Sequence, residues 1–214
     1  MKQKKLLKKK KKKLLFRVIE TIKLLLGLGN PGNAYFKTRH NMGFMAIDSL
    51  ISLYGLKEEN ENSLTWWGKT EIKTHEIIVA KPLTFMNLSG EAALWLMSYF
   101  KISPSQILII HDDMDISWGK IKIVKGGGSG GHKGVSSIQD YLKTKNIPRL
   151  KIGIGRPPTK NAINYVLSEF SSKEKEELKI IFKQVCIALT KIITEGLEKA
   201  MSFFNSKNLL KEGN

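Results

Sequence analysis

The feature that most constrains this chain is the alternation of short apolar runs with longer segments of helical periodicity. Apolar or alternating runs predict strands at residues 22–27, 107–110, 120–125 and 150–154, and a pair of strands within 67–81. Helical spacing predicts helices at residues 41–54, 89–100, 134–142 and 171–196. Strands that are apolar throughout are buried on both faces. The pattern therefore predicts one α/β domain built around a mostly buried sheet.

The charge of the chain points to a polyanionic partner. Its 214 residues include 36 Lys and Arg against 19 Asp and Glu, a net charge of +17. Residues 1–20 hold ten of these cations and one acid, and the run from Lys8 to Lys13 should be disordered by self-repulsion. The remaining chain is also basic. We therefore expect nucleic acid as a partner ahead of a membrane surface. The chain has a single cysteine, so it cannot form a disulfide framework.

A glycine motif follows the first predicted strand. Residues 27–32, Gly-Leu-Gly-Asn-Pro-Gly, match the dinucleotide fingerprint G-x-G-x-x-G. That fold needs a helix to begin within the motif, because the pyrophosphate binds the helix N-terminus. Here the helical pattern resumes only near Asn41, which argues against a nicotinamide or flavin oxidoreductase. The glycines are better explained by a tight turn that leaves Asn30 at the carboxyl edge of the sheet.

A second glycine run, at residues 126–131, contains the sequence G-x-S-x-G of the nucleophile elbow. A serine hydrolase of that class needs an acid and then a histidine later in the chain. His132 is the last histidine, and no acid separates it from Ser129. A Walker phosphate loop is also absent, since no Gly-Lys-Ser/Thr follows.

Acidic residues follow the strand predicted at 107–110, in the order His111-Asp112-Asp113-Met114-Asp115. Three carboxylates could bind a hard metal ion, but no second acidic cluster or spaced histidine pair completes a cage. Alternatively, one carboxylate orients a histidine. His40 is the obvious partner, because it follows a loop and precedes a helix. The other polar candidates, Asn30, Asn87, Asp112 and His132, likewise lie at the ends of strands or helices.

Five segments together carry a family resemblance: GLGNPGNAYFKTRHNMGF, KPLTFMNLSGEA, IIHDDMDI, GGGSGGHKG and RLKIGIGRP. In order and spacing they resemble bacterial peptidyl-tRNA hydrolase, over about residues 22–204. The resemblance implies a monomeric cytoplasmic esterase with a twisted mixed sheet between helices and no metal or cofactor. It would cleave the ester between peptide and tRNA in prematurely released peptidyl-tRNA. The implied catalytic domain is residues 21–206, between the lysine-rich extension and a short tail at 207–214.

The resemblance also implies roles for individual residues. His40 would be the general base that activates water, and Asp112 would fix its tautomer. Asn30 and Asn87 would hold the peptide backbone and the ester region, because an amide both donates and accepts hydrogen bonds. The remaining implied substrate-binding residues are Tyr35, Met86, His132 and Lys133.

This chain departs from the usual family sequence at two positions. Relatives generally have asparagine where this chain has Lys133, so the role of that amide does not carry over; we expect lysine, which only donates hydrogen bonds, to replace part of it. Val124 stands where the family usually has a basic residue, which shifts the expected phosphate contacts. The expected tRNA-binding residues are Lys122, Lys125, Arg149 and Lys151. A non-catalytic RNA-binding protein with the same fold is the alternative, and the presence of both His40 and Asp112 favours the enzyme.

Overall fold

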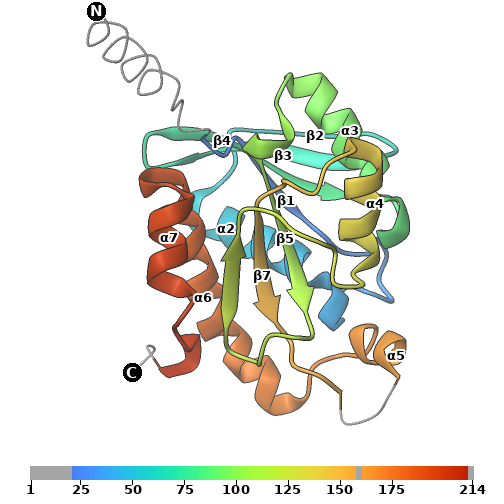
Figure 1. The fold of residues 1–214 in the computed structure, drawn as a ribbon, viewed down its shortest axis with the longest axis vertical. Helices are drawn as coiled ribbons and strands as arrows, with labels where there is room; N and C mark the ends of the chain where they lie inside the picture. Colours follow the sequence, from blue (N-terminus) through green and yellow to red (C-terminus); the bar gives the residue numbers. More distant parts are fainter. Residues whose placement is uncertain (1–20, 158–160, 212–214) are drawn as a thin grey trace, which may run out of the picture.

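The computed structural model describes residues 21–157 and 161–211 (Figure 1). Its strands are β1 Leu24–Gly27, β2 Glu58–Glu61, β3 Thr65–Ile72, β4 His75–Pro82, β5 Ile107–Asp113, β6 Ile121–Val124 and β7 Arg149–Gly153. Its α-helices are α2 Met42–Tyr54, α3 Ser89–Phe100, α4 Lys133–Leu142, α5 Ala162–Val166, α6 Ser172–Glu195 and α7 Leu197–Phe204. Single 3₁₀ turns are η1 Arg39–Asn41, η2 Met86–Leu88, η3 Pro104–Gln106 and η4 Leu209–Lys211.

The strands form one mixed sheet in the order β2-β3-β4-β1-β5-β7-β6. The central strands β4, β1, β5 and β7 are parallel, whereas β2, β3 and β6 pair antiparallel to their neighbours. The predicted mixed sheet is therefore confirmed. Because β1, β4 and β5 are parallel neighbours, the segments that follow them all emerge at one edge of the sheet, where open α/β sheets place their sites.

Helices cover both faces of the sheet (Figure 1). Successive residues of β1 point to opposite faces, so Leu25 packs into the core under α2, α6 and α7, and Leu24 and Leu26 into the core under α3 and α4. All three leucines are fully buried. Burial on both faces explains why the central strands are apolar throughout.

The periodic helices and the hairpin agree with prediction. Ser171 caps α6 and forms a capping box with Glu174, as their spacing indicates. Strands β3 and β4 join through Lys73, whose φ of 59° allows the tight turn. The strand predicted at 107–110 is longer than expected, since β5 continues through His111 and Asp112 to Asp113, paired with β7. His111 and Asp112 are polar, so apolar patterning ends before the strand does.

Three elements were not expected from the sequence. The edge strand β2 is exposed along its whole length and has no apolar pattern. The short helix α5 buries none of its residues. Helix α7 begins directly after Gly196, whose φ of 92° ends the preceding helix.

The domain boundary expected after residue 206 is too early. Leu209 is fully buried, and its N–H donates to the carbonyl of Gly119 at 2.7 Å, so the packed body continues through η4. The extension predicted at residues 1–20 lies outside the described residues. Within the described part of the chain, no helix is both long and apolar enough to cross a membrane.

Candidate active site

A cleft of about 490 Å³ opens at the carboxyl edge of the sheet. Asn30 reaches it from the turn after β1, Asn87 from the turn after β4, and Asp112 from the end of β5. His40 enters from η1, and His132 stands at the N-terminus of α4. The parallel order of the central strands is what brings these distant segments of sequence together.

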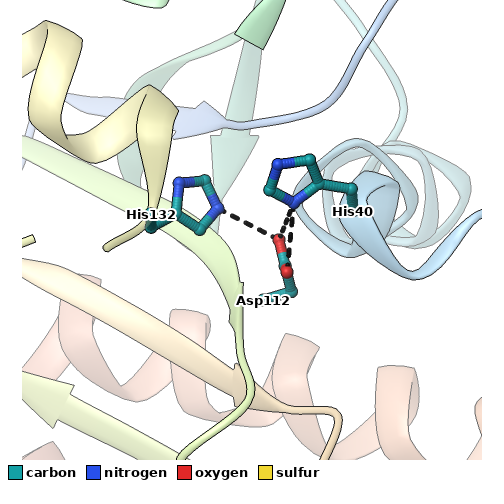
Figure 2. Close-up of side chains that lie close together, drawn as sticks. All are labelled: His40, Asp112 and His132. Carbon is teal, nitrogen blue, oxygen red and sulfur yellow. Dashed lines mark hydrogen bonds and ion pairs between the residues drawn. The ribbon is translucent and has the colours of Figure 1, made fainter. Parts of the chain in front are cut away.

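His40 and Asp112 are in direct contact at the base of the cleft (Figure 2). Nδ1 of His40 lies 2.9 Å from Oδ1 and 3.1 Å from Oδ2 of Asp112. A carboxylate only accepts hydrogen bonds, so Nδ1 carries the proton and donates it. The Nε2 atom of a neutral His40 is then unprotonated, which is the state that a general base requires.

His132 binds the same carboxylate from the other side (Figure 2). Its Nε2 lies 3.1 Å from Oδ1 of Asp112, and its Nδ1 accepts the backbone N–H of Val135 at 3.3 Å, capping α4. These two bonds fix the tautomer with the proton on Nε2. The rings of His40 and His132 lie 4.7 Å apart between centroids. Asp112 therefore holds two imidazoles side by side.

The electrostatics keep Asp112 ionised. Burial by itself would raise its pKa, but the charges and hydrogen bonds of the two imidazoles outweigh burial and hold the pKa well below its ordinary value. Neighbouring His111 shows the opposite balance: burial drives its pKa well below 6.5 and keeps it neutral. Nδ1 of His111 lies 2.6 Å from the Asp112 carbonyl oxygen, to which it donates, and its ring meets that of His132 edge to face.

The ligand atoms of His40, Asp112 and His132 all lie within 4.8 Å of one another, close enough to share a metal ion. The hydrogen bonds of His132 disfavour metal binding by these three residues. A metal at Nε2 of His132 would move that proton to Nδ1, where it would face the N–H of Val135 instead of accepting from it.

The other two carboxylates of the acidic segment are engaged as well. Asp113 pairs with Lys151 at 2.6 Å, and Asp115 pairs with Arg156 at 2.5 Å. Each therefore has a basic partner within the protein, so the hard-metal interpretation of this segment has no support in the described residues.

Asn30 is held rigidly by a residue that the sequence argument did not assign. The side chain of Asn41 accepts from the Asn30 N–H at 2.9 Å and donates to the Asn30 carbonyl at 3.0 Å. Oδ1 of Asn30 accepts the backbone N–H of Met86 at 2.8 Å. With these groups engaged, the amide nitrogen of Asn30 is the group that remains for a ligand in the cleft.

The cleft is mostly apolar above its polar base. Apolar side chains from three segments line it: Phe85 and Met86 after β4, Met114 after β5, and Ile163, Val166 and Leu167 in and just after α5. Asn87 and Lys133 are exposed and also line it, as expected, whereas Tyr35 does not. Tyr35 lies in the turn before η1, where its carbonyl accepts from Thr38.

The four basic residues expected to bind tRNA differ in their surroundings. Arg149 is 2% exposed and donates to the carbonyls of Gly127 and Gly128. Its guanidinium therefore supports the glycine loop, residues 126–131, and we exclude it as a phosphate contact. The half-buried Lys151 is held by Asp113, and Lys125 pairs with Glu198 on α7. Lys122 is exposed on the edge strand β6 and remains a good candidate.

A second, polar groove of about 620 Å³ lies next to the glycine loop. Lys143 and Lys145 line it beyond the end of α4, and Ser129 borders both this groove and the cleft. These lysines were not predicted from the sequence, because two lysines after a helix are typical of any solvated helix end.

Comparison with known proteins gives one consistent result. A family model described as peptidyl-tRNA hydrolase matches residues 24–212. The peptidyl-tRNA hydrolase of Aquifex aeolicus is 44% identical over 88% of this chain and 99% of its own. The chloroplastic peptidyl-tRNA hydrolase of Arabidopsis thaliana is 42% identical over 88% of this chain and 66% of its own. The crystal structure of the Acinetobacter baumannii enzyme matches with a TM-score of 0.83 at 32% identity, covering 89% of this chain and 98% of that one.

Proposed function

The chain belongs to the peptidyl-tRNA hydrolase family and is an enzyme of that class, and we propose that it cleaves its substrate with His40 as general base and Asp112 as the group that orients it. The observation that carries this proposal is the pair of contacts between Nδ1 of His40 and the carboxylate of Asp112. They leave Nε2 free to accept a proton.

The reaction is the hydrolysis of an ester between the peptide carboxyl group and the 3′-terminal ribose of tRNA. Nε2 of His40 takes a proton from water as the water oxygen attacks the ester carbonyl. Asp112 stabilises the imidazolium that forms, because its own pKa is held low and it stays an anion. As the tetrahedral intermediate collapses, the ribose oxygen leaves and receives that proton from His40. The products are free tRNA and a peptide carboxylic acid, which loses its proton to solvent at neutral pH.

The developing oxyanion needs donors near the ester carbonyl. Asn87 and Lys133 line the cleft next to the His40–Asp112 pair, and each offers N–H donors. Lys133 is also the first residue of α4, whose N-terminus carries partial positive charge. We assign the oxyanion to these groups, with Lys133 in place of the asparagine that relatives generally have there.

The peptide is bound mainly through groups that do not depend on its sequence. The free amide nitrogen of Asn30 donates to a backbone carbonyl, and the apolar side chains along the cleft, including Met86, contact whatever side chains are present. This combination accounts for an enzyme that accepts many peptides.

The tRNA is bound through its phosphates. Lys122 lies on the face of β6 opposite the core under α6 and α7, the same side of the sheet as α4. Lys143 and Lys145 line the groove that adjoins the cleft. We propose that these lysines contact the acceptor end of tRNA, an interaction that weakens steeply with salt.

Release of free tRNA from a peptidyl-tRNA, compared between wild type and Asp112→Asn, tests this mechanism. An amide at residue 112 can donate to His40 and favour the wrong tautomer, so we expect kcat to fall by about 10³-fold or more. Glu59→Gln, the same change of a carboxylate to an amide at an exposed position on the far edge strand β2, is the control and should be unchanged. EDTA should not affect the wild type. A near wild-type rate for Asp112→Asn contradicts the mechanism.

A further inference from the structure

Arg39 immediately precedes the proposed base and is 6% exposed, although arginine is rarely buried unless paired. Its side chain turns away from Asp112 toward the segment that follows α5. We propose that Arg39 is a positioning residue that fixes the apolar α5 wall of the cleft relative to His40.

The guanidinium of Arg39 binds both the segment between α5 and α6 and the first turn of α6. Its Nη1 donates to the Ser168 hydroxyl at 2.9 Å and to the Glu169 carbonyl, and its Nη2 pairs with Glu174 at 2.7 Å. Backbone contacts run parallel to these bonds: the Arg39 N–H donates to the Ser168 carbonyl at 3.1 Å, and Thr38 forms an isolated bridge with Glu169. One side chain thus joins η1 to the chain between α5 and α6.

The same guanidinium also packs on two aromatic rings. Its Cζ lies 4.6 Å from the ring centroid of Tyr165, within α5, and 5.1 Å from that of Phe170. The hydroxyl of Tyr165 in turn donates to the carbonyl of Ile154 at 2.6 Å, which ties α5 to the end of β7. Lysine cannot reproduce this combination of a planar fork and a stacked face.

Helix α5 needs such an anchor, because it has no buried residue of its own. It holds Ile163, 60% exposed, and is followed by Leu167, 38% exposed, both lining the cleft. Exposed apolar side chains above a polar catalytic pair are suited to contacting an apolar peptide side chain. If α5 moves relative to His40, that contact weakens while the His40–Asp112 pair stays intact.

This inference rests on the proposed function and predicts a selective loss of substrate binding. On the same tRNA, the KM for a peptide ending in phenylalanine should rise about tenfold in Arg39→Met. The KM for a peptide ending in glycine should change less than about twofold, because glycine has no side chain to reach the wall. The kcat should stay near wild type for both substrates. Arg39→Lys should recover the KM only in part.

Two controls separate positioning from general damage. Lys175→Met removes the exposed ion pair with Glu169 on the same segment and should leave both KM values unchanged. Ile163→Ser, at a position that is 60% exposed, should raise the KM for the phenylalanine substrate as Arg39→Met does. In the double variant the two effects should not add, since both act through the same wall.

Equal KM changes for the two substrates in Arg39→Met, an unchanged KM in Ile163→Ser, or additive effects in the double variant would each overturn the inference. Failure of the wild type to hydrolyse either substrate would instead overturn the proposed function. The two failures are therefore distinguishable.

Discussion

A carboxylate that is shared by two imidazoles has to stay ionised to orient either of them. Asp112 meets this condition because both rings donate to its carboxylate. The motifs around His40, Asp112 and His132 could be located from sequence. The shared carboxylate could not, because it depends on how α4 and η1 approach β5. Arg149 was predicted from the sequence to be a surface cation, but it is buried and donates to carbonyls of the glycine loop.

The low pKa of His111 predicts a pH dependence of stability. Below its ordinary pKa of 6.5, the unfolded chain takes up a proton that the folded protein excludes, so stability falls as the pH falls. Asp112 has little effect in that range: its lowered pKa contributes stability that is lost only as the pH falls below about 3.8, the ordinary pKa of an aspartate. Urea unfolding should show a loss of up to about 1.4 kcal/mol per pH unit from this site between pH 6.5 and 5.

The control for this prediction is His111→Asn, which has no group that titrates in this range. Its stability at pH 7.5 will differ from wild type for other reasons, so the comparison is the change in unfolding free energy between pH 7.5 and pH 5. That change should be smaller in the variant. An equal change in both proteins would show that His111 is protonated in the folded state.

The substitution of lysine for the family asparagine leads to a second prediction. If Lys133 donates to the oxyanion and attracts the 3′ end of tRNA, Lys133→Ala should lower kcat/KM clearly. Lys133→Asn should keep or raise kcat/KM while making binding less sensitive to salt, because the amide restores the donor without the charge. Wild-type kcat/KM and salt dependence in Lys133→Ala would mean that the side chain takes no part.

At the level of elements, the strongly periodic helices and the buried strands were predictable. Each of these helices packs one apolar face on the sheet, and the central strands are apolar throughout because both of their faces are covered. β2 and α5 were not. β2 is a charged edge strand defined only by pairing with β3, and α5 is held by Arg39 and Tyr165 rather than by an apolar stripe. Tertiary contacts decide these two elements. Helix α7 differs from them, because Leu197, Ala200, Met201 and Phe204 form an apolar stripe at helical spacing that the sequence prediction passed over.

The approach of α2 to the sheet gives an element-scale prediction. A Cβ at Gly43 would lie 2.3 Å from the carbonyl oxygen of Ile110 and from the backbone nitrogen of Leu28, so β1, β5 and α2 would have to separate. Gly43→Ala should therefore lower the unfolding free energy by at least about 2 kcal/mol, despite the better helix propensity of alanine.

Gly128→Ala is the matched control, since a Cβ there has no atom within 4 Å and the backbone conformation is accessible to alanine. It should change the unfolding free energy by less than about 0.5 kcal/mol. Thermal or urea unfolding of both variants checks the difference. Equal stabilities for the two variants would contradict the close packing of α2 on the strands.

In the molecule as a whole, the densest positive charge and the proposed catalytic residues lie in different parts of the chain. The His40–Asp112 pair lies at the sheet edge within the folded body, whereas the highest density of positive charge in the sequence is in residues 1–20. Deletion of residues 1–20 should leave kcat nearly unchanged. It should reduce the slope of log K against log salt for tRNA binding, because fewer phosphates are neutralised. An unchanged slope would show that this segment does not contact tRNA.

In the proposed mechanism, His40 performs the chemistry and does not merely hold the substrate. The most direct measurement is the single-turnover rate of peptidyl-tRNA hydrolysis by His40→Ala at saturating enzyme, together with the Kd for tRNA. His75→Ala, at the start of β4 and outside the cleft, serves as the control. We expect a rate at least about a hundredfold below wild type with an unchanged Kd. A near wild-type rate in His40→Ala, or a loss of rate explained entirely by weaker tRNA binding, would contradict it.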